Sequence, residues 1–82
     1  MHKIIRLITW FDKQREELTG KLELGEIPVE KLQTLFGESS ENPMYDCYPI
    51  TPKNASFFQD LAKQDLRFDL YDYFLECEED RD

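Results

Sequence analysis

Few residues in this sequence are suited to catalysis. His2 is the only histidine and stands beside the N-terminus, where a side chain rarely has the fixed position of a general acid or base. Ser39 and Ser40 lie in a polar stretch without a neighbouring base. No nucleophile elbow, phosphate loop or dinucleotide-binding motif is present. The sequence therefore predicts no catalytic residue, and we expect a protein that is not an enzyme.

The two cysteines, Cys47 and Cys77, are thirty residues apart. This spacing is not that of a zinc site. Acidic residues surround both thiols, and negative charge raises a thiol pKa, so neither cysteine is expected to be a nucleophile. In a reducing cytosol we expect two buried free thiols rather than a disulfide.

Carboxylates are plentiful, with 18 acidic residues against 10 lysines and arginines. Asp72 and Glu76 fall on one face of a predicted strand, but Phe74 stands between them. A hard cation such as Mg²⁺ needs several converging oxygens, which one strand does not supply. We therefore expect no metal and no cofactor, and a solvated acidic face is the simplest interpretation.

The net charge of −8 belongs entirely to the second half of the chain. Residues 1–36 contain six acids and six bases, whereas residues 37–82 contain twelve acids and four bases. Such asymmetry favours association with a basic surface and disfavours direct nucleic-acid binding, because phosphates are repelled.

Hydrophobic periodicity predicts the elements that must position these groups. The expected strands are 2–11, 17–25, 44–51 and 66–77, and the expected helices are 27–37 and 51–65. Pro28 and Pro52 suit first helical positions, Thr51 an N-cap and Gly37 the residue after a helix. Gly20 is a candidate β-bulge and Pro49 limits the third strand.

The order of these elements is ββαβαβ. We predict an α+β fold, a two-layer sandwich in which two helices cover a four-stranded, mainly antiparallel sheet. An 82-residue chain is one domain, for which we assign residues 1–77. Residues 78–82 are expected to form an acidic C-terminal tail that frays into solvent.

The last predicted strand has apolar residues on both faces. Tyr71, Tyr73, Leu75 and Cys77 share the face expected to join the core. The other face combines Asp72 and Glu76 with the apolar residues Phe68, Leu70 and Phe74. An apolar second face indicates an interior strand, or a strand whose second face meets a partner.

The N-terminal stretch MHKIIRLITWFDK is basic and then apolar, which also describes a signal peptide. Its apolar part is short, contains Arg6 and is followed by no small-residue cleavage site. No apolar run approaches the ~18 residues of a membrane helix. We therefore expect a cytoplasmic protein with no membrane contact.

Three stretches resemble a known family when they are taken together: TWFDK at 9–13, MYDCYPIT at 44–51 and YDYFLEC at 71–77. They are similar to a family of short, uncharacterised bacterial proteins that carry a domain of unknown function. The resemblance implies no activity and no catalytic residues. The size and acidity also look like those of immunity proteins, which neutralise bacterial toxins.

The function predicted first is a non-enzymatic acidic binding protein, an immunity protein that covers the active surface of a basic, nuclease-type toxin. Tyrosine is common at interface hot spots, and acids beside it select a basic partner. The predicted partner-binding residues are Tyr45, Asp46, Tyr48, Asp72, Glu76, Glu78 and Glu79. One alternative is a structural or adaptor homodimer that hides Phe68, Leu70 and Phe74. Another is a nucleic-acid mimic that requires its acids on one continuous surface.

Overall fold

A computed structural model describes residues 3–80. The predicted strand end at His2 and the last two residues of the predicted tail, Arg81 and Asp82, lie outside this range. The elements follow in the order β1 (Lys3–Asp12), β2 (Leu18–Gly25), α1 (Val29–Phe36), β3 (Tyr48–Ile50), α2 (Ala55–Ala62) and β4 (Tyr71–Asp80). The predicted ββαβαβ order and α+β class are confirmed.

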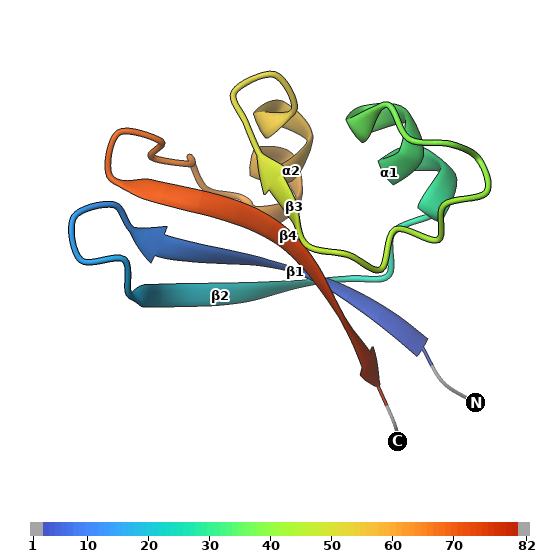
Figure 1. Ribbon diagram of the computed structural model, residues 1–82, viewed down its shortest axis with the longest axis horizontal. Coiled ribbons are helices and arrows are strands. Elements are labelled where there is room, and N and C mark those ends of the chain that lie inside the picture. Colours follow the sequence, from blue (N-terminus) through green and yellow to red (C-terminus); the bar gives the residue numbers. More distant parts are fainter. Residues whose placement is uncertain (1–2, 81–82) are drawn as a thin grey trace.

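The four strands form one antiparallel sheet in the order β2-β1-β4-β3. β1 pairs with β4 along ten residues, from Lys3 opposite Asp80 to Asp12 opposite Tyr71. Both helices lie on the same side of this sheet (Figure 1). We call that side the helix-covered face and the other the open face.

The core lies between the helices and the helix-covered face. Its buried members come from the strands, both helices and the loops between them: Ile8, Leu32, Met44, Ile50, Ala55, Phe58, Leu66, Tyr73 and Leu75. Tyr71 and Trp10 pack against this cluster. Tyr71, Tyr73 and Leu75 of the predicted core face are therefore found in or against the core, whereas Cys77 is half-buried and is not part of this cluster.

The last strand differs from its predicted bounds at both ends. It begins at Tyr71 because residues 68–70 form a turn, in which the Leu70 and Tyr71 amides both donate to the Arg67 carbonyl. Phe68 packs its ring against Tyr73, 5.4 Å between centroids. Phe68, Leu70 and Phe74 therefore do not share one face. The strand also continues to Asp80, paired with β1, so residues 78–80 are part of the sheet rather than a frayed tail.

Two other elements are shorter than predicted. β3 contains three residues, and the segment 44–47 before it is a loop. The second helix begins at Ala55 and not at Pro52. Residues 52–54 form a turn, closed by the Thr51 amide donating to Asn54 Oδ1 at 2.9 Å. Asn54 therefore occupies the N-cap position that the sequence assigned to Thr51.

The glycine predictions have clear structural reasons. Gly37 ends α1 with a left-handed backbone, φ 66°, which glycine adopts without strain. Gly20 lies opposite Trp10, and the pairing register shifts immediately beyond this pair. A Cβ at Gly20 would overlap the Trp10 indole, so glycine lets the ring lie flat against β2.

Neither helix of the described chain is long and apolar enough to cross a bilayer.

Candidate functional site

The open face carries most of the predicted acidic site. Alternation along β4 places Asp72, Phe74, Glu76 and Glu78 on this face. Leu7 and Thr9 of the neighbouring β1 are only 3% and 5% exposed, although no helix covers them. Long charged side chains from the flanking strands therefore shield the centre of this face from water.

Two contacts show how that cover is built. Thr9 Oγ1 donates a hydrogen bond to Glu76 Oε2 across the β1–β4 pair. Lys21 Nζ lies 3.8 Å from Glu78 Oε1, and β1 runs between the two strands that carry these charges. Both partners of this ion pair are more than half exposed, so salt screens it and it contributes little to stability.

An open hollow of about 450 Å³ lies at one end of the open face. We call it the acidic hollow. It is lined by Phe11, Asp12, Glu16, Cys47, Asp72, Phe74 and Glu76. The Phe11 and Phe74 rings meet edge to face, 5.8 Å between centroids. The site therefore combines an aromatic floor with four carboxylates.

Some of these carboxylates already have partners. Asp12 Oδ1 accepts the backbone amides of Gln14 and Arg15, at 2.8 and 3.1 Å, which closes the turn after β1. Lys13 Nζ lies 3.8 Å from Asp72 Oδ1. Lys13 and Lys21 thus interrupt the row of acids, whereas a nucleic-acid mimic requires a continuous acidic surface.

Cys47 joins the acidic hollow from the loop before β3. Partial burial raises the pKa of its thiol, and the nearby Glu76 carboxylate raises it further. The thiolate form is therefore disfavoured at this position. As a whole residue Cys47 is exposed, so the prediction of a buried cysteine is wrong for it; Cys77 is half-buried, and both cysteines are free. Among residues 3–80, no three His, Cys, Asp or Glu side chains converge to hold a metal ion.

The loop at residues 38–47 is held by buried polar side chains. Gln33 on α1 donates from Nε2 to the carbonyls of Ser40 and Asn42, at 3.2 and 2.7 Å. The Arg6 guanidinium, 3% exposed on the helix-covered face, donates to the carbonyls of Met44 and Pro43. These donors fix the loop backbone from two sides.

Asn42 and Met44 hold the same loop from within. Asn42 Nδ2 donates to the Tyr48 hydroxyl at 3.0 Å, and its Oδ1 accepts the Met44 amide at 2.8 Å. The Met44 side chain is fully buried although its backbone is left-handed, φ 61°. Met44 therefore pins the loop to the core at a conformation that is unusual for a non-glycine residue.

The residue after Met44 points into solvent. Tyr45 is 59% exposed, and its carbonyl accepts the Cys77 thiol at 3.3 Å. Asp46 and Cys47 follow and are also exposed. The held loop thus presents a tyrosine and an aspartate to solvent, and the next residue, Cys47, lines the acidic hollow. We call residues 45–47 the presented segment.

The seven residues predicted to bind a partner divide into three groups. Asp72, Glu76 and Glu78 share the open face, and Tyr45 and Asp46 belong to the presented segment. Tyr48 is partly buried, with its ring 5.4 Å from that of Phe36. Glu79 alternates with Glu78 and therefore projects from the opposite side of β4. Of the seven, Asp72 and Glu76 line the acidic hollow.

The sequence prediction missed the residues that complete the site. Phe11, Asp12 and Glu16 come from the end of β1 and its turn, about sixty residues from Asp72 in the chain. Arg6 and Gln33 hold the loop. The available signal was Arg6 itself, because a charged residue in phase with Ile4, Ile8 and Trp10 must find buried hydrogen-bond acceptors.

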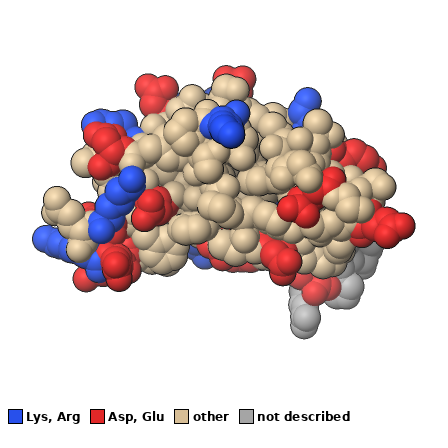
Figure 2. Space-filling view, turned by 45° about the horizontal axis from the view of Figure 1, so that its top comes forward, with Lys and Arg blue, Asp and Glu red and all other residues tan. Residues whose placement is uncertain are grey.

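The charges are distributed unevenly over the surface. Figure 2 shows basic and acidic side chains mixed at the end that carries the β1–β2 hairpin, and mainly acidic side chains at the other end. The exposed acids Glu38, Glu41 and Asp46 belong to the loop at that acidic end. The loop between α1 and β3 therefore adds negative charge to that end of the molecule.

Comparison with protein families identifies a match over residues 5–76 to a family described as "Domain of unknown function (DUF7683)". The match covers most of the chain and confirms the expected kinship with a family of unknown function. It makes no connection with immunity proteins. No curated protein matches the chain.

Proposed function

Because this chain belongs to the DUF7683 family, whose function is unknown, we propose its role from the geometry: a non-enzymatic protein that binds a basic partner protein. The observation that carries this proposal is the presented segment, which exposes a tyrosine on a held loop and reaches the acidic hollow through Cys47. Tyr45 and Asp46 supply one side of the contact surface, and Asp72 and Glu76 supply the other.

Three physical properties support a binding role. An exposed tyrosine contributes a large contact area at low entropy cost and is common at interface hot spots. A loop already fixed by Arg6, Gln33 and Asn42 loses little conformational entropy on binding. Carboxylates around an aromatic floor attract Lys and Arg side chains, and an arginine also stacks favourably on aromatic rings.

We further propose that the partner is a nuclease-type toxin and that this chain is its immunity protein. Nucleases bind phosphates and therefore carry cationic surfaces. An inhibitor of net charge −8 associates quickly with such a surface through electrostatic steering. Covering that surface blocks nucleic acid without any chemical step.

The test starts with capture of the partner from the native host at low salt and elution at high salt. The purified pair is then measured for association rate and for nuclease activity at several ionic strengths. We expect association to slow by about tenfold or more between low and high salt, and nuclease activity to fall as the complex forms.

The decisive variant is the double charge reversal Asp72→Lys with Glu76→Lys. A second variant, Tyr45→Ala, tests the presented segment. Asp60→Lys with Asp65→Lys changes the net charge equally at exposed positions on and after α2. We expect the first two variants to weaken binding and the α2 control to bind normally. Equal binding by all of them would exclude this site, and salt-independent association would exclude the electrostatic mechanism.

A further inference from the structure

β2 is the long unpaired edge of the sheet. It pairs with β1 on one side, and no strand within residues 3–80 pairs with its other side. The edge is eight residues long and contains no proline. The opposite edge, β3, is three residues long and contains Pro49, which cannot donate a ladder hydrogen bond. An unpaired strand of this length presents a row of backbone donors and acceptors to a partner strand.

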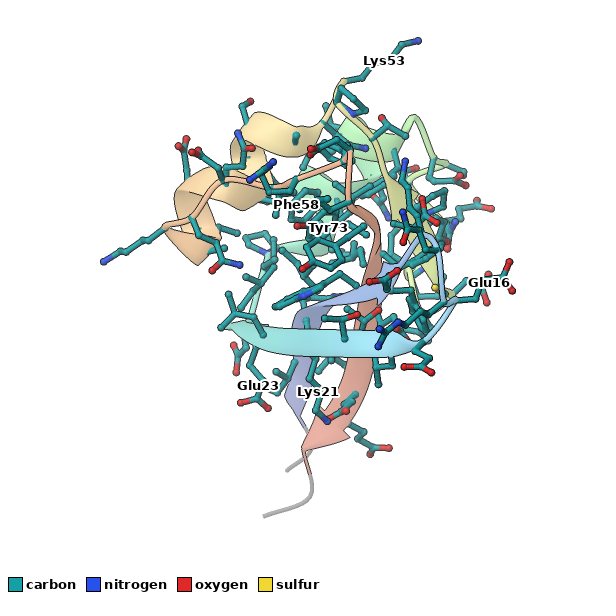
Figure 3. The ribbon with its side chains drawn as sticks, turned by 90° about the vertical axis from the view of Figure 1, so that its left-hand side faces the viewer. Glu16, Lys21, Glu23, Lys53, Phe58 and Tyr73 are labelled. Carbon is teal, nitrogen blue, oxygen red and sulfur yellow. The ribbon has the colours of Figure 1, made fainter. Side chains whose placement is uncertain are left out.

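The middle of β2 is regular enough to accept such a strand. Residues 20–23 pair in register with residues 7–10 of β1, and the register shifts lie on either side of this stretch. Lys21 and Glu23 project from β2 away from Phe58 and Tyr73, on the open face (Figure 3). Leu22, between them, projects to the helix-covered face and is partly exposed.

We propose that this edge binds a second copy of the chain, with β2 antiparallel to the partner's β2 about a two-fold axis through Leu22. Lys21 of each copy then lies opposite the partner's Glu23, and the two Leu22 side chains meet on the axis. The sheet becomes continuous through eight strands, and the interface is isologous.

The charges select this register over its neighbours. The two-fold axis places the open face of one copy beside the open face of the other, so residues that pair must lie on the same face. Because side chains alternate between faces, the neighbouring registers shift the pairing by two residues. One alternative places Lys21 opposite its own copy, and the other places Glu23 opposite its own copy. Like charges directly opposite each other destabilise a strand pair, whereas opposite charges stabilise it. A lone lysine on this edge would block pairing, but the nearby Glu23 makes the edge self-complementary.

This dimer differs from the homodimer predicted from the sequence and does not depend on the proposed function. Phe68, Leu70 and Phe74 play no part in it. The presented segment precedes β3, at the opposite edge of the sheet, so each copy keeps it accessible.

The test is sedimentation equilibrium of the full chain over a concentration series, with Lys21→Glu and Glu23→Lys as single variants. Each variant replaces two attractive contacts of the dimer with two repulsive ones. We expect each to weaken self-association by about tenfold or more. Lys53→Glu is a matched reversal at an exposed position away from β2, and it should dimerise like the natural chain.

Mixing the two β2 variants gives the sharpest result. In the mixed pair, the glutamate introduced at position 21 of one chain faces the lysine introduced at position 23 of the other. At the second contact, the unchanged Glu23 of the first chain faces the unchanged Lys21 of the second. We expect equimolar mixing to restore association to within about threefold of the natural chain.

The rescue separates the intermolecular contact from an internal one, because loss of the Lys21–Glu78 ion pair within a chain cannot be repaired by mixing. Three outcomes would overturn the proposal. They are a natural chain that is monomeric at ~1 mM, a dimer insensitive to both reversals, and variants that mixing does not rescue.

Discussion

The two faces of the sheet bury the same central strand by different means. On the helix-covered face, Ile8 is sealed by apolar side chains from both helices. On the open face, Leu7 and Thr9 are equally hidden, but beneath long charged side chains. Apolar packing is lost only when the protein unfolds, whereas a charged side chain can turn toward a partner without disturbing the fold. The open face is therefore suited to binding and the helix-covered face to stability.

The largest expected effect breaks the helix-covered face. Phe58 is fully buried. Its ring centroid lies 6.0 Å from that of Phe36 and 5.2 Å from that of Phe57. Phe58→Ala should lower the free energy of unfolding by about 3–5 kcal/mol. Phe74→Ala is the matched change on the open face, where the ring is only partly buried, and should cost about 1–2 kcal/mol. Urea unfolding measures both, and equal losses would contradict the contrast between the faces.

The next effect concerns the loop that supports the presented segment. Gln33→Ala removes both donors to the Ser40 and Asn42 carbonyls and should cost about 1–3 kcal/mol. Amide hydrogen exchange at residues 42–47 should accelerate. Thr34→Ala is the neighbouring control, since the exposed Thr34 hydroxyl donates to the Glu30 carbonyl of its own helix. Unchanged exchange in Gln33→Ala would mean that Gln33 does not hold the loop.

A smaller effect tests the polar cover of the open face. Thr9→Val keeps the shape of the side chain and removes its hydrogen bond to Glu76. We expect a loss of about 0.5–1.5 kcal/mol in thermal or urea unfolding. Thr19→Val is the control, because the Thr19 hydroxyl is exposed and bonds to the Glu17 carbonyl. A loss near the Phe58→Ala value would show that the open face is held as firmly as the other.

The smallest effect lies outside both faces, at the turn before β4. A side-chain hydrogen bond from Arg67, 2.9 Å between Nη2 and Oδ2, lowers the pKa of Asp69. A lowered carboxyl pKa stabilises the fold above the unfolded pKa, and this contribution is lost as the pH falls through the folded pKa. An NMR titration should show Arg67→Gln returning the pKa toward its ordinary value, and added salt should do the same. A pKa that is unaffected by both changes would exclude this ion pair.

The sequence predicted the parts of the fold that depend on local periodicity. Alternation identified Tyr73 and Leu75 as core and Asp72 and Glu76 as the other face, because side chains of a strand alternate strictly. Of the predicted partner-binding residues, Asp72 and Glu76 line the acidic hollow, whereas Tyr48 packs against Phe36 and Glu79 projects from the other side of β4; their binding role stays a prediction.

What the sequence by itself determined is the order of elements, their faces and the excess of acid in the second half. Only the tertiary structure decided that Phe11 and Glu16 meet Cys47 and Asp72 in one hollow, and that β2 is the long open edge of the sheet. Strand order and register depend on which distant segments pair, and local side-chain pattern does not encode that choice. The physical reason is that a strand hydrogen-bonds to its neighbours in space, while periodicity reports only its neighbours in the chain.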